Sequence, residues 1–372
     1  MNETLKARTW AEISLNNLEH NYNILRQRIP CGCRLMGIVK ANAYGHGAKQ
    51  IALKLQELGA DMLGVACLDE ALELRQCGVY IPILCLGQTP VEFAPLIMAN
   101  NITQVISDLE TAQAFSDVAA KGKKELTVHI ALDTGMTRLG FQWNEDSKEK
   151  SLREILRVTS LPGLNIEGMF THFSNADGDE SYTMMQFNRF CDAKKALSEK
   201  GIDFEIYHCA ASAAMLNYPI TCMDMIRPGI ALYGYPNSKE QYGLLPVLTL
   251  KSRVVAVRNV PAGTFVGYGC TAKLSRDTKL AVLPIGYADG FSRSFSNGME
   301  ILIHDCRCPV IGRVCMDMCM VDVTDVQNVK KNDIAVIYSR NDLMDEGSAR
   351  AGTIPNDLLA RIAPRVHRVY MD

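Results

Sequence analysis

Residues 35–47 read LMGIVKANAYGHG, an apolar run that reaches a lysine and continues into a short loop containing two glycines. Further apolar runs follow at residues 62–66, 83–87, 103–107, 126–132, 164–170, 204–208 and 225–233. Runs that are apolar throughout indicate strands buried on both faces, as in parallel sheets. Amphipathic stretches at 15–28, 108–121 and 181–200 predict helices. Eight strand–helix repeats predict an α/β fold, a (β/α)8 barrel, with a doubly wound open sheet as the alternative.

The pattern changes after Pro236. Short apolar segments separated by turn residues follow at 248–260, 279–284, 300–304, 309–314 and 320–323, and the next helical pattern is 354–362. Short apolar segments separated by turns predict a mainly antiparallel β-domain. The segment GYPNSKEQYGLLP (234–246) is polar and rich in turn formers, as linkers are. We therefore expect a barrel over residues 8–240 and a β-domain over residues 241–372.

Composition excludes several classes of protein. The 372 residues carry 39 Lys and Arg against 41 Asp and Glu, which leaves no positive excess for binding nucleic acid. The 13 cysteines are odd in number and lack metal-ligand spacing, so we expect reduced thiols in a cytoplasmic protein rather than disulfides or a metal site. No apolar run approaches the roughly 20 residues that span a bilayer, and the N-terminus lacks the apolar core of a signal peptide.

Candidate functional residues lie where the predicted strands end, because barrel enzymes place their chemistry there. Burial of Lys40 at the end of the first run would lower its pKa, and a neutral amine can form a Schiff base with an aldehyde. The alternative is a lysine whose charged end simply reaches solvent. Other strand ends carry Asp133, Arg138, Glu167, His172, His208 and Ser212, and Arg227 lies in the last apolar run. One buried arginine usually belongs to a structural ion pair, but several such loops are expected to meet on one face.

Seven motifs, taken together and in order, resemble the alanine racemase family, which uses pyridoxal 5'-phosphate (PLP). They are VKANAYGHG (39–47), DTGMTRLG (133–140), EGMFTHF (167–173), RPGIALYG (227–234), VGYG (266–269), PIGYADG (284–290) and GRVCMDM (312–318). The resemblance extends from about Thr9 to Tyr370. It implies a PLP-dependent isomerase with a TIM-like PLP-binding barrel followed by a β-domain.

The resemblance also implies a role for individual residues. Lys40 would hold PLP and exchange a proton on one face of the substrate, and Tyr268 would do so on the other, because racemisation needs two acid–base groups. In the family this tyrosine comes from a second subunit, so a homodimer with shared active sites is expected. The implied cofactor contacts are Lys40, Tyr44, His172, Ser212, Arg227, Gly229 and Ile230, and the implied substrate contacts are Arg138, Tyr287, Met316 and Asn356. Because an arginine holds its proton tightly, Arg227 would leave the pyridine nitrogen of PLP unprotonated.

Three positions depart from the family pattern. Ala131 stands where the family often has a lysine, Ala211 where it often has asparagine, and Asn356 where it usually has tyrosine. An asparagine amide can bond to a hydroxyl group, and this chain resembles the racemase domain of the vancomycin-resistance serine/alanine racemases, which is normally joined to a membrane domain. We therefore expect racemisation of serine and alanine for cell-wall precursors.

Four alternatives remain open at the level of sequence. The first is an ordinary alanine racemase with little serine activity. The others are a PLP barrel decarboxylase, a non-enzymatic PLP-binding regulator, and a barrel enzyme for phosphorylated substrates in which Lys40 binds only an anion.

Overall fold

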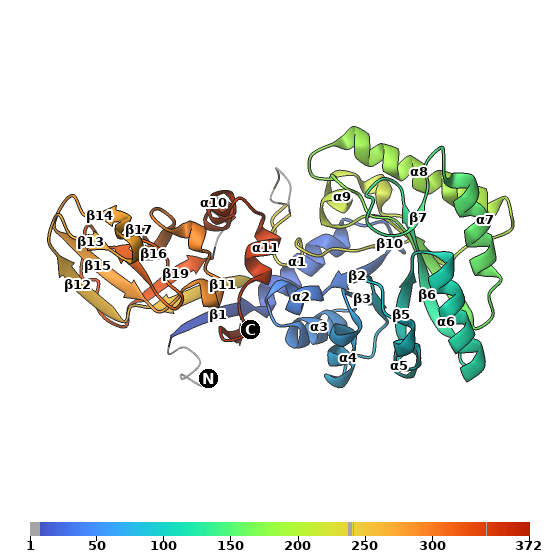
Figure 1. The fold of residues 1–372 in the computed structure, drawn as a ribbon, viewed down its shortest axis with the longest axis horizontal. Helices are drawn as coiled ribbons and strands as arrows, with labels where there is room; N and C mark the ends of the chain where they lie inside the picture. The colour runs from blue at the N-terminus through green and yellow to red at the C-terminus, as the bar shows by residue number, and fades with distance from the viewer. Residues whose placement is uncertain (1–7, 237–239, 241, 340) are drawn as a thin grey trace. The chain divides into compact units, whose positions relative to one another are not determined.

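The computed structural model describes residues 8–236, 240, 242–339 and 341–372. The chain forms two compact units (Figure 1). The barrel unit comprises Glu19–Ala43 and Ala48–Leu244. The sheet unit comprises the described residues up to Leu18 together with Tyr44–Gly47 and Leu245–Asp372. The division is therefore not a single cut in the chain, since the N-terminal residues group with the C-terminal half.

The barrel unit is built on parallel strands that neighbour one another in chain order. Within the described residues these are β2 (Arg34–Ile38), β3 (Met62–Val65), β4 (Ile83–Cys85), β5 (Ile102–Ile106), β6 (Leu126–Asp133), β8 (Leu164–Phe170), β9 (Ile206–His208) and β10 (Met225–Ile226). The last strand, β10, pairs with the first, β2. Backbone hydrogen bonds from Asp224 to Tyr207 and from Arg227 to Ala210 join β10 to β9. The predicted (β/α)8 barrel is confirmed, and each predicted run contains one strand.

One helix leads into the first of these strands and the others connect successive strands (Figure 1). They are α1 (Leu15–Gln27), α3 (Ala48–Glu57), α4 (Leu68–Gln76), α5 (Ala94–Ala99), α6 (Leu109–Gly122), α7 (Lys148–Thr159), α8 (Glu180–Ser198) and α9 (Ser212–Asn217). The side chain of Asp108 caps α6 by accepting from the Thr111 N–H, and Asp179 caps α8 by accepting from the Tyr182 N–H. None of the helices in the described residues is long and apolar enough to cross a membrane.

The sheet unit contains a nine-stranded sheet within the described residues. Its order is β12 (Ala256–Val260), β15 (Thr278–Leu283), β18 (Cys319–Asp322), β17 (Cys306–Ile311), β16 (Glu300–Ile303), β19 (Ile334–Tyr338), β11 (Leu248–Arg253), β1 (Thr9–Ser14) and β20 (His367–Met371). All neighbours run antiparallel except β1 and β20. A small hairpin joins β13 (Phe265–Val266) to β14 (Ala272–Lys273). The expected antiparallel β-domain is confirmed.

Several elements of the sheet unit differ from the sequence-based expectation. The segment 248–260, expected as one run, forms the two strands β11 and β12, while β19, β20 and helix α10 (Asn341–Ala351) had no predicted counterpart. Helix α10 was missed because Gly347 weakens its helix propensity and a serine, Ser348, is one of its buried residues. The predicted helix at 354–362 is confirmed by α11 (Pro355–Ala360).

The cysteine thiols are unpaired, and all 13 lie in the described part of the chain. Burial raises the pKa of Cys33 to about 11 and that of Cys222 to about 12, so both thiols stay protonated at neutral pH. Protonated, buried thiols are poor nucleophiles and pack as small apolar side chains.

The buried carboxylate of Asp289 ties together distant parts of the sheet unit. It accepts hydrogen bonds from Arg8 at 2.6 and 2.9 Å, from Arg365 at 2.7 Å and from the Gly286 N–H at 2.9 Å. Burial raises the pKa of Asp289, but these donors together lower it below its usual range. The N-terminal segment, the 286–289 turn and the C-terminal segment are therefore held at one point.

Replacing this carboxylate should destabilise the sheet unit. We expect Asp289→Ala to lower the free energy of unfolding by about 2–3 kcal/mol, because several charge-assisted hydrogen bonds are lost. Urea unfolding measures the change. Asp325→Ala is the matched control, because Asp325 also accepts two hydrogen bonds from one arginine, Arg276, but does so at an exposed position. An equal loss of unfolding free energy in the two variants would contradict the role assigned to Asp289.

Candidate active site

Lys40 lies directly after β2 and begins an unusual turn, labelled α2 (Lys40–Tyr44) in Figure 1. The next four residues, none of them glycine, have φ between 51° and 54°, which is left-handed backbone. Such a conformation costs roughly 1–2 kcal/mol per residue. The Glu70 carboxylate opposes this cost by accepting from the Ala41 N–H at 2.6 Å and from the Ala66 N–H at 2.7 Å. Strain is thus concentrated at the lysine that the sequence singled out.

The environment of Lys40 favours its neutral amine. Burial lowers the pKa of Lys40, and the positive charge of Arg138 lowers it further. Glu70 raises this pKa and Arg227 lowers it, with smaller effects than that of Arg138. A larger fraction of neutral amine at neutral pH makes Lys40 a better nucleophile toward an aldehyde.

Arg227 lies just after β10 and is only 3% exposed. Its guanidinium donates to His208 Nδ1 at 3.0 Å, to His172 Nδ1 at 3.1 Å, and to the carbonyl oxygens of Thr171 and Cys209 at 2.8 and 3.1 Å. Burial lowers the pKa of Arg227 to about 10, so the group is still charged at neutral pH. Within the described residues of the barrel unit, no carboxylate forms an ion pair with it.

The two histidines beside Arg227 are neutral. Burial lowers the pKa of His208 and of His172 well below the usual value, and the nearby Arg227 charge lowers both further. Since a guanidinium can only donate hydrogen bonds, each histidine must accept through Nδ1. The neutral tautomer of both rings therefore carries its hydrogen on Nε2.

Ser212 and the turn after β10 are brought together at the N-terminus of α9. The Ser212 hydroxyl oxygen accepts from the Gly229 N–H at 3.0 Å and from the Ala231 N–H at 3.2 Å. Ile230 lies between these two residues and is 4% exposed. The family resemblance named Ser212, Gly229 and Ile230 but not Ala231, whose N–H also bonds to Ser212.

Tyr44 and the two glycines that follow it belong to the sheet unit. A side chain on Gly45 would lie 2.1 Å from the Leu359 carbonyl oxygen, and one on Gly47 would lie 1.9 Å from the Tyr370 hydroxyl. Both glycines also have positive φ. These approaches explain the glycines of the YGHG motif, since no other residue fits there. Burial raises the pKa of Tyr44 to about 12, so its phenol stays protonated.

The loops carrying Tyr287 and Met316 are bonded to each other in the sheet unit. The Tyr287 N–H donates to the Cys315 carbonyl at 3.1 Å, and the Ala288 N–H donates to the Met316 carbonyl at 3.0 Å. A Cβ on Gly286 would lie 2.3 Å from both of these carbonyl oxygens. Tyr287 and Met316 are 43% and 54% exposed, so both side chains are accessible.

Tyr268 and Asn356 are also in the sheet unit. Tyr268 follows β13 and is 69% exposed, which leaves its phenol accessible. Asn356 lies in the first turn of α11, and its Oδ1 atom is buried without a hydrogen-bond partner in the described part of the chain. A buried acceptor left unpaired is costly and marks a place where a ligand donor would be favoured.

The donor set of the barrel unit fits PLP. A lysine with a lowered pKa suits the aldehyde, and a buried guanidinium lacking a carboxylate suits the pyridine nitrogen, which accepts hydrogen bonds. The hydroxyl and N–H groups around Ser212 suit a phosphate. By contrast, no cluster of three or more metal-ligating side chains occurs among the described residues.

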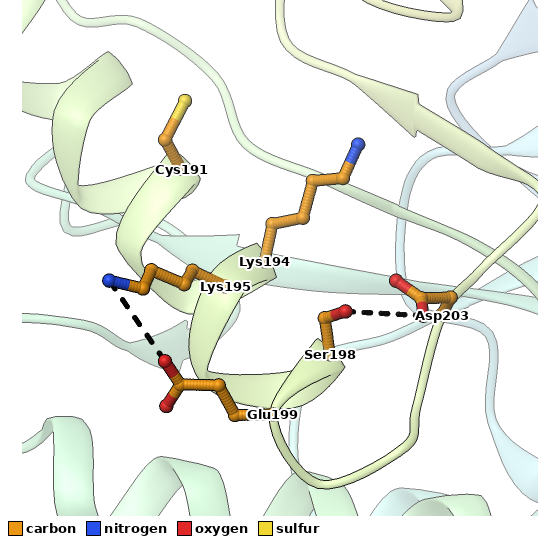
Figure 2. A pocket seen from close by; sticks show the side chains of 6 residues that line it. All are labelled: Cys191, Lys194, Lys195, Ser198, Glu199 and Asp203. Atoms are coloured by element: carbon orange, nitrogen blue, oxygen red, sulfur yellow. Dashed lines mark hydrogen bonds and ion pairs between the residues drawn. The ribbon is translucent and has the colours of Figure 1, made fainter.

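A separate surface pocket of about 490 Å³ lies along α8 (Figure 2). It is lined by Cys191, Lys194, Lys195, Ser198, Glu199 and Asp203. Lys195 and Glu199 form an ion pair at 3.9 Å, and Ser198 donates to Asp203 at 3.2 Å. Because none of the predicted site residues lines this pocket, it is distinct from the candidate active site.

Comparison with known proteins connects the whole chain to one family. Residues 13–237 match the alanine racemase N-terminal domain, and residues 247–370 match the alanine racemase C-terminal domain. An alanine racemase from Methanococcus maripaludis is 41% identical over 371 residues, which cover 97% of this chain and 98% of that protein. One from Clostridium perfringens strain SM101 is 42% identical over 370 residues, covering 97% and 95%.

Solved structures give the same result. An alanine racemase of Clostridium difficile 630 superposes with a TM-score of 0.92 at 37% identity, covering 98% of this chain and 96% of that one. The alanine racemase of Bartonella henselae, described with covalently bound pyridoxal phosphate, has a TM-score of 0.88 at 27% identity, covering 98% and 100%.

The electrostatic environment of Lys40 leads to a prediction about pH. Removing the positive charge in Arg138→Leu should raise the Lys40 pKa, so less neutral amine is present at a given pH. Covalent capture of PLP by the apoenzyme should then become half-maximal at a higher pH than in the wild type. Absorbance of the bound cofactor, followed over a pH series, measures this. Arg153→Leu removes an equal charge from an exposed position on α7 and should leave the profile in place. If both variants share the wild-type profile, Arg138 does not act on Lys40.

Proposed function

The chain belongs to the alanine racemase family, and from this we propose that it interconverts L- and D-alanine as a PLP-dependent isomerase, supplying D-alanine for cell-wall precursors. The observation that carries the proposal is the pair formed by Lys40, with its lowered pKa, and the buried charged Arg227. The family match covers both halves of the chain, which disfavours an isolated PLP-carrying barrel without enzymatic activity.

Racemisation requires that a proton leave Cα on one face and return on the opposite face. When bound, PLP supplies an electron sink that makes the Cα proton acidic. Lys40 Nζ would hold or release the proton on one face, and the Tyr268 hydroxyl would do so on the other. Arg227, oriented by His172, would donate to the pyridine nitrogen and leave it unprotonated.

The remaining predicted residues would bind and orient the ligands. Tyr44, Ser212 and the N–H groups of Gly229 and Ile230 would hold the phosphate of PLP. Arg138 would pair with the substrate carboxylate, assisted by the backbone N–H of Met316, and Tyr287 would stand at the entrance. These roles follow from the family resemblance.

Lys40 and Tyr268 belong to different units, and we propose that a homodimer joins them, each site using Lys40 of one copy and Tyr268 of the other. Support comes from the sheet unit, which exposes large apolar side chains that association could cover, including Phe265, Tyr268, Met316 and Met318. A C2 dimer would create two equivalent sites.

Mixing two inactive variants tests the reaction and the shared site together. Lys40→Ala and Tyr268→Phe should each lose alanine racemisation, measured by chiral chromatography with PLP added. After subunit exchange, a hybrid dimer has one intact site, so activity should recover to about one quarter of the wild-type value for random pairing. A wild-type protein that does not racemise alanine would refute the function. An active wild type whose variants never complement would refute only the shared site.

A second substrate, serine, is favoured by one observation, the unpaired buried Oδ1 of Asn356. This oxygen could accept a hydrogen bond from a serine hydroxyl, whereas the alanine methyl group offers no donor. The similar proteins above are all named alanine racemases, and none is named a serine/alanine racemase. They therefore support alanine as the main substrate and give no support to a vancomycin-resistance enzyme, so serine activity is proposed only as an addition.

Two substitutions separate hydrogen bonding from space at this position. Asn356→Leu keeps a similar side-chain volume without polar atoms, and Asn356→Tyr fills the space. Each should reduce kcat/KM for serine by about tenfold, the effect of one hydrogen bond, while kcat/KM for alanine changes little. Bound-PLP absorbance confirms that the site is intact. Unchanged serine turnover in both variants would rule out a role for Asn356 in substrate choice.

A further inference from the structure

A chain of hydrogen bonds runs from Arg227 through the inside of the barrel unit to a carboxylate. Arg227 donates to His208 Nδ1 at 3.0 Å, and His208 Nε2 lies 2.8 Å from His129 Nδ1. His129 Nε2 in turn lies 2.9 Å from Glu167 Oε2. Neither Glu167 nor His129 has a role in the proposed reaction as described so far.

The direction of every bond in this chain is determined by its two ends. Arg227 can only donate, so His208 accepts at Nδ1 and, being neutral, carries its hydrogen on Nε2. That hydrogen is donated to His129 Nδ1, so His129 must carry its own hydrogen on Nε2. The ionised carboxylate of Glu167 can only accept, and it receives this last hydrogen. The guanidinium at one end and the carboxylate at the other therefore both require the Nε2–H tautomer of His208 and of His129.

Burial makes this arrangement sensitive to its terminal acceptor. His129 and His208 are fully buried, whereas the Glu167 side chain is 24% exposed. Without Glu167, the His129 Nε2–H would lose its partner inside the barrel unit, and an unpaired buried donor is costly. His129 could then adopt its other tautomer. That tautomer would reverse the bond to His208 and place an N–H against the Arg227 guanidinium.

The backbone of β8 is shaped around this chain. Val128 lies opposite Ile166 and His129 lies opposite Gly168, so Glu167 is an extra residue in a β-bulge. Bulges re-aim side chains and are frequent beside active sites. A Cβ on Gly168 would lie 2.6 Å from the Ile206 carbonyl oxygen and 2.8 Å from His129 Cε1, so only glycine leaves room for both the neighbouring strand and the ring.

We propose that Glu167 is a positioning residue for the racemase reaction, acting through His129 and His208 to orient the Arg227 guanidinium toward the ring nitrogen of PLP. The proposal rests on the proposed function for its catalytic consequence. Its structural part, the locked tautomers of two buried histidines, is independent of that function. Glu167 touches neither cofactor nor substrate in this role.

Nitrogen-15 NMR of the imidazole rings tests the structural part in the apoenzyme, and the seven histidines of the chain make the spectrum tractable. Wild type should show His129 and His208 as single Nε2–H tautomers. Glu167→Leu should give mixed tautomers. Glu167→Gln should largely restore the single Nε2–H tautomers, because its amide oxygen still accepts a hydrogen bond. In the holoenzyme, kcat for alanine should fall about tenfold in Glu167→Leu with little change in KM, and Glu167→Gln should recover most of it.

Glu145→Leu is the matched control, because Glu145 pairs with Lys148 at 2.8 Å at an exposed position and lies outside the hydrogen-bond chain. It should leave tautomers and kcat unchanged. If Glu167→Leu does not fold, Glu167→Met replaces it, since its unbranched side chain fills more of the space of the glutamate and still removes the acceptor.

Each outcome is decisive. Wild-type tautomers in Glu167→Leu would overturn the proposal, whatever the activity. Altered tautomers with the kcat of the Glu145 control would overturn the positioning role. If wild type lacks racemase activity, the proposed function fails instead, and the NMR result still stands by itself.

Discussion

The barrel unit is organised around one constraint, a buried positive charge with no carboxylate beside it among the described residues. Removing a guanidinium from water costs several kcal/mol unless its donors are satisfied. Arg227 meets this cost with neutral acceptors, two carbonyl oxygens and two imidazole nitrogens. Those acceptors come from the ends of β8 and β9, so the last three strands of the barrel must close with their ends in register. The charge that remains uncompensated is then available to a ligand.

The turn that begins at Lys40 has a second energetic cost, at the same end of the barrel. Four consecutive non-glycine residues in left-handed backbone would not persist in an isolated peptide. Glu70 stabilises the turn from the neighbouring strand–helix connection. Gly45 and Gly47, within the sheet unit, allow the chain to pass close to Leu359 and Tyr370. Four strained residues and a desolvated lysine follow β2, and a desolvated arginine follows β10, so the packing of the barrel must offset these costs.

Local sequence pattern predicted the barrel strands and several site residues of this protein. Features that depend on pairing between distant parts of the chain were not predicted. The eight barrel strands were visible because each is a separate apolar run, and Lys40 and Arg227 stood out because charge is costly in such runs. Strand β1 was not placed in the sheet unit, because nothing in residues 9–14 indicates partners that lie more than 230 positions away. His129 was overlooked since one histidine in an apolar strand resembles an ordinary core residue. The bulge at Glu167 depends on register, which residue types do not encode.

The two histidines between Arg227 and Glu167 also have an electrostatic consequence. A carboxylate in direct contact with Arg227 would neutralise much of its field, because charges at hydrogen-bond distance interact strongly in a buried site. The two imidazole rings instead separate the Glu167 carboxylate from the guanidinium. They still determine the direction of each hydrogen bond in the chain. The guanidinium therefore remains firmly held and strongly positive at once. A group that must keep a ring nitrogen unprotonated needs both properties, since it has to donate a hydrogen bond without giving up its proton.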